Sequence, residues 1–163
     1  MGNLTMKLSK NIRVLKGKEV KLIMQMIERQ WGYKKKPDHH FLEHKDGTIC
    51  IVNKEVSEFE LDKVRINSIG LDIARKQNDK LVLSIEGAQM IGPNAKRNLI
   101  ELNYKLARLW MKGYDIPFDE EEGKKLKGFQ ILKNNNDYLG CGIFKENRII
   151  NFMPKARILV VND

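Results

Sequence analysis

Two cysteines and three histidines are the side chains in this sequence best suited to chemistry. The histidines stand shortly before the first cysteine: His39, His40, His44 and Cys50. Imidazole nitrogen and thiolate sulfur are ligands of zinc, and His40 and His44 fall on the same side of an extended strand. No second ligand pair with the usual zinc spacing follows, and Cys141 stands alone between two glycines. We therefore expect no metal and no cofactor, and we interpret both cysteines as small buried residues.

A basic and aromatic cluster offers a second kind of chemistry. Lys34–Lys36 follow Trp31 and Tyr33, and lysines beside exposed rings can hold a phosphate while a ring stacks on a base. In the alternative interpretation Trp31 belongs to the hydrophobic core. The acidic run Glu120–Glu122 also has two interpretations, a cation site or a solvated loop, and we favour the loop.

The net charge of +9 is concentrated at the two ends of the chain. Residues 1–36 carry ten Lys or Arg against two Glu, and residues 145–163 carry four against two acidic side chains. Residues 37–144 are almost neutral, with sixteen basic and seventeen acidic side chains. Such a field attracts the phosphates of RNA, DNA or an anionic membrane. The alternative is that the lysines only keep a small protein soluble.

The chain has 163 residues, of which 42% are hydrophobic, so it is long enough to bury a core. It contains no apolar run of about 18 residues that would span a membrane. Its first residues lack the apolar segment of a signal peptide. These features predict a soluble cytoplasmic protein with no membrane partner, and they leave its oligomeric state open.

The elements that must position these side chains begin with an amphipathic helix. Apolar residues recur at spacings of three and four over residues 18–31, and Gly32 is placed to end the helix. The pair Asp46-Gly47 predicts the turn of a β-hairpin. The first half of the chain thus predicts an α+β unit with these elements: a helix at 18–31, strands at 40–44 and 48–52, a short helix at 55–63, and strands at 66–74 and 80–85.

The stretch Gly87–Pro93 predicts a connection between two compact units, because two glycines and a proline punctuate it. The predicted boundary separates an α+β domain at residues 1–90 from a domain at residues 94–163. The second domain is expected to be a small β-barrel with one or two helices. Its expected elements are a strand at 98–102, a helix at 104–111 ended by Gly113, an acidic turn at 119–122, and strands at 129–133, 138–144 and 157–161.

The second domain resembles a known family. The matching stretches are Trp110-Met-Lys-Gly113, Gly128-Phe-Gln-Ile-Leu132, Asp137-Tyr-Leu-Gly-Cys-Gly-Ile-Phe144 and Arg148-Ile-Ile-Asn-Phe-Met-Pro-Lys155. Together they resemble the PUA-like domain of the Sun/RsmF type of rRNA cytosine-5 methyltransferases, over about residues 95–163. The most specific parts are Leu139–Gly142 and Asn151–Lys155. Val82–Met90 also resembles the lead-in to such a domain, and the whole chain is similar to small ribosome-assembly factors that pair a pre-PUA domain with a PUA domain.

The resemblance implies binding to structured RNA, either rRNA in a pre-ribosomal particle or tRNA, and does not imply methylation. A methyltransferase needs a Gly-rich loop and a doubly wound sheet for S-adenosylmethionine, and the sequence predicts neither. The related enzymes use a cysteine in a Pro-Cys context, which neither Cys50 nor Cys141 has. We therefore expect a protein of RNA modification or ribosome biogenesis that is not an enzyme.

Two glycines of the second domain have two interpretations. Without a Cβ, Gly140 and Gly142 either let an RNA backbone approach closely or let the barrel close. The expected phosphate contacts come from basic residues around them and from the N-terminal arm. The RNA-binding prediction therefore comprises Gly140, Gly142, Lys145, Arg148, Lys155, Arg157, Lys34, Lys35 and Lys36. The alternative function is a protein–protein adaptor in ribosome assembly that meets assembly or modification proteins, and a small RNA-modifying enzyme is a third hypothesis.

Overall fold

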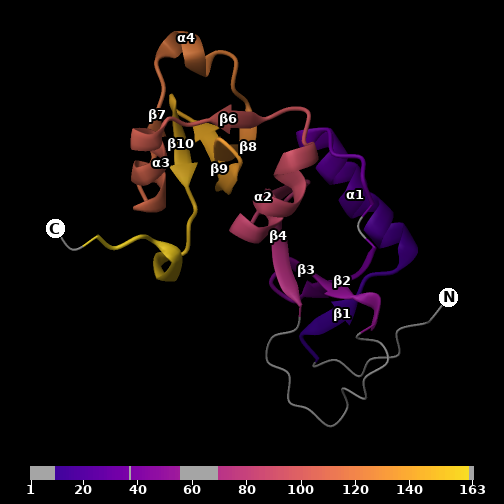
Figure 1. Ribbon diagram of the computed structural model, residues 1–163. Coiled ribbons are helices and arrows are strands. Elements are labelled where there is room, and N and C mark those ends of the chain that lie inside the picture. The colour runs from indigo at the N-terminus through magenta and orange to yellow at the C-terminus, as the bar shows by residue number, and fades with distance from the viewer. Residues whose placement is uncertain (1–9, 37, 56–69, 162–163) are drawn as a thin grey trace.

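The computed structural model describes residues 10–36, 38–55 and 70–161. They form an α+β structure with two five-stranded sheets (Figure 1). The N-terminal sheet is antiparallel throughout, in the order β1-β2-β3-β4-β5. Its elements are β1 (Ile12–Val14), α1 (Gly17–Trp31), β2 (His39–His44), β3 (Thr48–Asn53), β4 (Leu71–Gln77) and β5 (Lys80–Leu83).

The predicted helix and hairpin of the first half are both present. α1 buries Ile23, Ile27 and Trp31 against the sheet and ends at Gly32, whose φ of 66° is left-handed. Its N–H donates to the carbonyl of Glu28 at 2.7 Å, which closes the helix end. The turn between β2 and β3 is at the predicted Asp-Gly pair. The expected short helix at 55–63 and the start of the strand at 66–74 lie outside the described residues.

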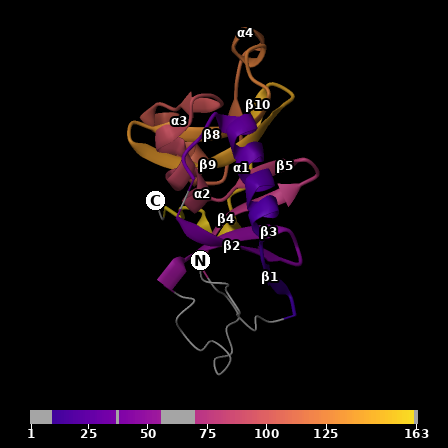
Figure 2. The ribbon, with the colours of Figure 1, turned by 90° about the vertical axis from the view of Figure 1, so that its right-hand side faces the viewer.

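The segment Gly87–Pro93, which the sequence predicts as a connection between two compact units, lies in a helix and the turn that follows it. α2 (Ile85–Ile91) starts at Ser84, whose Oγ accepts a hydrogen bond from the N–H of Gly87 at 2.9 Å. A short 3₁₀ turn, η3 (Gly92–Asn94), continues it. α2 lies between the two sheets, against β4 on one side and β9 (Asp137–Lys145) on the other (Figures 1 and 2). Within this connecting helix, Gly87 and Ala88 are packing residues, and both are buried.

The C-terminal sheet forms a curled half-barrel in the order β6-β8-β9-β10-β7. Its first pair is parallel and the others are antiparallel. α3 begins at Asn103, whose side chain accepts from the N–H of Leu106, and it ends before Gly113. The remaining elements are β6 (Leu99–Glu101), α3 (Tyr104–Met111), β7 (Ile116–Pro117), α4 (Glu120–Gly123), β8 (Gly128–Asn134), β10 (Arg148–Asn151) and the 3₁₀ turn η4 (Lys155–Arg157).

Two predicted elements of the second half were wrong. The segment from Arg157 to Val161 is not a strand; it starts in η4 and runs past the end of α3, where Leu159 N–H donates to the Met111 carbonyl at 2.8 Å. Both edges of β10 are already occupied, by β9 and β7, so this segment has no place beside it. The acidic turn is the short helix α4, because the side chain of Asp119 accepts from the N–H of Glu122 and caps it.

One hydrophobic core spans both sheets. The cluster that contains Ile27, Ile73 and Ile91 from the first half also contains Phe129, Ile131 and Cys141 from β8 and β9. A second, smaller cluster around Trp110, Ile116 and Ile149 fills the half-barrel. The two units are therefore packed together and not simply joined by a linker. Among the described helices, none has the length and apolar character needed to cross a membrane.

Candidate nucleic-acid interface

The C-terminal end of α1 is tied to the segment that enters the second sheet. The carbonyl of Trp31 accepts hydrogen bonds from the N–H of Lys96 at 2.7 Å and of Arg97 at 3.3 Å. Gly32 makes this approach possible, because a Cβ there would lie 2.9 Å from the Cβ of Lys96 and 3.3 Å from Nε of Arg97. The last turn of α1 is thus capped by two residues far along the chain.

Amide side chains hold this junction in place. Gln30 donates to the carbonyl of Leu81 at 2.9 Å and accepts from its N–H at 2.8 Å. The side chain of Asn98 donates to the Gln30 carbonyl at 2.5 Å. Nε2 of Gln130, a residue that is 1% exposed, donates to Asn98 Oδ1 at 3.3 Å and to the Lys127 carbonyl at 2.8 Å. A connected polar network of this kind fixes α1 relative to β8.

Six exposed basic residues adjoin this junction: Lys96 and Arg97 lie against the end of α1, Lys34–Lys36 follow that end along the chain, and the Lys127 carbonyl accepts from Gln130. We call this set the junction surface: Lys34, Lys35, Lys36, Lys96, Arg97 and Lys127. The acidic partner that the structure shows for it is Glu28, 3.8 Å from Lys34, and both side chains are largely exposed. An ion pair of that length and exposure offsets little of the positive charge. Figure 2 shows α1 reaching from the first sheet to the second, so the surface lies across both units.

The aromatic rings beside the lysines are not exposed. Trp31 is 0% exposed and Tyr33 is 6% exposed, so the core interpretation of Trp31 is correct and stacking of a base on either ring is excluded in this conformation. Burial raises the pKa of the Tyr33 hydroxyl. Nε1 of Trp31 is buried, with no hydrogen-bond partner among the described residues. The lysines therefore offer charge without a stacking platform.

The four predicted C-terminal cations are not brought together. Lys145 and Arg148 flank the β9–β10 turn, where Arg148 lies 3.7 Å from Asp115 and 3.9 Å from Glu146. Lys155 and Arg157 follow the other end of β10, which is a four-residue strand. At about 3.3 Å per residue, that strand alone separates the pairs by more than 10 Å.

Two of these cations are also partly neutralised. Arg157 donates to Glu86 of α2 at 2.7 Å. The β9–β10 turn packs against acidic α4, where a Cβ on Gly123 would meet the Phe144 ring at 2.8 Å and Asn147 Oδ1 at 2.9 Å.

The two glycines of β9 serve packing. Gly142 is buried, and a Cβ there would lie 2.5 Å from the Ile150 carbonyl and 2.8 Å from the Trp110 ring. Gly140 has a φ of 133°, a value that side chains rarely adopt, and it lies against the Trp110 indole. This geometry favours the barrel-closure interpretation for Gly142. Gly140 also contributes to the wall of a pocket.

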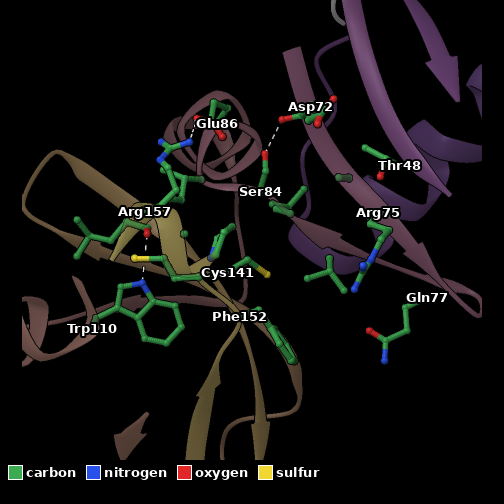
Figure 3. A pocket seen from close by; sticks show the side chains of 18 residues that line it. Thr48, Asp72, Arg75, Gln77, Ser84, Glu86, Trp110, Cys141, Phe152 and Arg157 are labelled. Atoms are coloured by element: carbon green, nitrogen blue, oxygen red, sulfur yellow. Dashed lines mark hydrogen bonds and ion pairs between the residues drawn. The ribbon is translucent and has the colours of Figure 1, made fainter. Parts of the chain in front are cut away.

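That pocket lies between the two units and has a volume of about 280 Å³. Arg75 and Gln77 of β4 line one side of it, and Trp110 and Phe152 line the other (Figure 3). Phe152 is 46% exposed, so part of its ring is free to contact another molecule. Arg157 stands at the rim. Donor groups opposite an exposed ring suit a planar polar molecule such as a nucleobase.

Neither cysteine is an activated nucleophile. Burial, with a contribution from the charge of Asp72, raises the pKa of Cys50 to about 11. Burial raises the pKa of Cys141 to about 12. A thiol with such a pKa is almost entirely protonated at neutral pH, so the thiolate needed for nucleophilic attack is scarce. This agrees with their interpretation as buried residues.

Comparison with known proteins identifies the second unit. Residues 97–159 match the family described as the methyltransferase RsmF PUA domain. Residues 97–159 are a PUA domain of the RsmF type. The PUA domain thus contains β6 to β10, α3 and α4, and the resemblance deduced from the sequence is confirmed.

Two relatives carry the same name, ribosomal RNA small subunit methyltransferase F, and come from Vibrio cholerae serotype O1, strains M66-2 and ATCC 39315 / El Tor Inaba N16961. Each is 26% identical over 104 residues, which is 64% of this chain and 21% of the relative. The chain therefore spans about a fifth of the length of these proteins. Because 104 residues exceed the PUA match, the similarity also extends N-terminal of the PUA domain.

Sequence reasoning missed the parts of the site that depend on tertiary structure. Lys96 and Arg97 occur as an isolated basic pair in an almost neutral stretch, and only the capping of α1 brings them beside Lys34–Lys36. Arg75 and Gln77 fall between the predicted strands at 66–74 and 80–85, whereas β4 extends through them and places them at the pocket. The one available signal was the Lys96-Arg97 pair at the start of the stretch that resembles a PUA-like domain.

Proposed function

We propose that this protein binds structured RNA, with the phosphate backbone held on the junction surface. The observation that carries the proposal is the position of an exposed cationic surface at the edge of a PUA domain, where few acidic side chains offset it. Phosphate contacts supply most of the sequence-independent affinity for nucleic acid. RNA is the ligand we propose because the relatives are named as ribosomal RNA methyltransferases.

The biological setting we propose is rRNA modification or ribosome assembly in the cytoplasm, without catalysis by the part of the chain described here. The two protonated, buried thiols support this, since the nucleophile expected of a cytosine-5 methyltransferase is a cysteine. Detection of S-adenosylmethionine binding by calorimetry would contradict the non-enzymatic part of the proposal.

We further propose that the pocket between the units accepts one unpaired base. Phe152 would contact the base through its exposed ring edge or face, while Arg75 and Gln77 would donate hydrogen bonds to its polar atoms. A base that leaves its stack in this way gives an RNA-binding protein selectivity that phosphate contacts cannot provide.

The test is a salt titration of affinity for a structured rRNA fragment. Glutamine at Lys35, Lys96 and Arg97 removes three cations without touching the backbone groups that cap α1. Each phosphate contact contributes about 0.7–0.9 to the slope of log affinity against log salt, so this triple variant should flatten the slope by about two and bind more weakly at low salt.

Two further variants with equal loss of charge make the test specific. Glutamine at Lys18, Lys45 and Lys105, which are exposed elsewhere, should leave the slope nearly unchanged. The third variant carries glutamine at Lys145, Arg148 and Lys155. It tests whether the C-terminal cations predicted from the sequence contact the RNA phosphates. If the third variant alone flattens the slope, the junction surface is the wrong site; if the wild type shows no salt-dependent binding, RNA binding itself is refuted.

A second function is favoured by one specific observation. The chain after η4 exposes a short apolar run, with Leu159 at 44%, Val160 at 80% and Val161 at 39% exposure. Exposed aliphatic residues in sequence are typical of protein contacts, which agrees with the adaptor alternative. A protein partner that stays bound after nuclease treatment, and is lost when Val160 and Val161 are changed to serine, would support it.

A further inference from the structure

Three metal-ligating side chains converge on the N-terminal sheet, away from the junction surface. Cys50 on β3 stands opposite Leu42 of β2 on one side and opposite Asp72 of β4 on the other. Two residues along β2 from Leu42, Nε2 of His44 lies 3.5 Å from Sγ of Cys50. One ligand atom from each of His44, Cys50 and Asp72 lies within 4.8 Å of the other two. The cluster thus draws one residue from each of three adjacent strands.

A β-bulge places the acidic member of this cluster. In the pairing of β3 with β4, Ile49 stands opposite Ala74, but the next residue, Cys50, stands opposite Asp72. The extra residue, Ile73, joins Ala74 in the core, where both are buried. With regular alternation, the isoleucine and not the aspartate would stand opposite Cys50. Bulges often re-aim a side chain in this way at functional sites.

We propose that His44, Cys50 and Asp72 bind a Zn²⁺ ion, with the fourth position left to water and the thiol proton of Cys50 released to solvent on binding. Nitrogen, sulfur and carboxylate oxygen are the three kinds of protein ligand that zinc takes, and three protein ligands plus water is a common arrangement. With Zn–S of about 2.3 Å and Zn–N of about 2.0 Å in a tetrahedron, sulfur and nitrogen lie about 3.5 Å apart. That is the separation of Sγ and Nε2 here.

The accessibility of the cluster suits capture of an ion from solution. Cys50 is 0% exposed, His44 is half-buried and Asp72 is exposed. The thiol and imidazole are thus held in place by the sheet, while the carboxylate has the freedom to close onto the ion. Asp72 also lines the pocket proposed for a base, but binding of the ion itself needs no RNA. The proposal replaces the sequence-based expectation of no metal, in which His39 and His40 were grouped with His44. Neither of those two histidines belongs to the cluster.

The experiment is titration of the metal-free full chain with Zn²⁺ by calorimetry and with Co²⁺ by absorption spectroscopy. The wild type should bind one ion per chain and show the thiolate-to-Co²⁺ charge-transfer band. Cys50→Ala should abolish that band, while His44→Ala and Asp72→Asn should each weaken Zn²⁺ binding at least about tenfold, since even outer partners of ligands have effects of that size.

Matched controls use the same residue types outside the cluster. His40→Ala removes a histidine from the same strand, and Cys141→Ala removes the other thiol; both should bind Zn²⁺ as the wild type does. Because Asp72 is exposed, Asp72→Asn will fold even if Cys50→Ala does not, and its unchanged affinity would overturn the three-ligand site. Absence of Zn²⁺ binding, or binding without the Co²⁺ thiolate band, overturns the proposal. The contact between Cys50 and His44 would then be only a sulfur–imidazole hydrogen bond.

Discussion

Gly87 offers a sharp test of how the two units are joined. It lies in α2 where the helix touches β4, and a Cβ at this position would be only 1.9 Å from the Ile73 carbonyl oxygen and 2.8 Å from its carbon. Backbone atoms cannot swing aside as a side chain can, so Gly87→Ala forces α2 away from the sheet. If Gly87 were a linker glycine, the same substitution would be harmless.

The magnitude follows from two opposing terms. Overpacking of a well-filled core costs about 1–3 kcal/mol, and a clash this close belongs at the upper end. Alanine regains about 1 kcal/mol through its better helix propensity. The net loss of about 2 kcal/mol lowers Tm by about 4–8 °C in a protein of this size. Thermal unfolding followed by circular dichroism measures the change.

Gly17→Ala is the matched control, because Gly17 also lies in a helix but has no atom within 4 Å of an added Cβ. Its Tm should stay the same or rise by about 2 °C. The packing argument fails if Gly87→Ala melts within about 1 °C of the wild type, since the clash would then be relieved at no cost.

Two further predictions concern the side chains of Glu43 and Trp31. Burial by itself would raise the pKa of Glu43, but hydrogen bonds from Lys76 and Arg13 outweigh it and hold the pKa below its ordinary value. Such a carboxylate stabilises the fold above its unfolded pKa and loses that effect as the pH falls through the folded pKa. Denaturant titration should therefore find Glu43→Gln less stable than the wild type at neutral pH, and the difference should shrink as the pH falls below the unfolded value of about 4.3; a constant difference would contradict this. Trp31→Phe should change RNA affinity less than about twofold because the indole is buried, and a tenfold loss in the folded variant would restore the stacking hypothesis.

The sequence predicted the elements whose signals are local. The spacing of apolar residues together with Gly32 located α1, and the pair Asp46-Gly47 located the first hairpin. In the second half, the strands around Leu139–Gly142 were found for the same reason. The resemblance to an RsmF-type PUA domain supplied the fold of this half, which periodicity alone would have left as an unspecified barrel.

The failures share a physical cause, which is that the deciding partner is distant in sequence. α2 was missed because its buried face is made of Gly87 and Ala88, which give no hydrophobic periodicity. The segment from Ile158 onward has the composition of a strand. It packs instead against Gly113 and the end of α3, which are distant in sequence. Likewise, Asp72 stands opposite Cys50 only because of a β-bulge, and no local sequence pattern predicts that bulge.

The core that runs through both sheets also limits how the PUA domain can be handled in the laboratory. A fragment that begins near residue 97 would bring Phe129, Ile131 and Cys141 to its surface, since their neighbours lie in the first half of the chain. Such a fragment would expose a contiguous apolar surface and aggregate. In the intact chain, the same packing holds α1 and β8 in fixed positions, so the proposed binding of RNA would cost little conformational entropy in the protein.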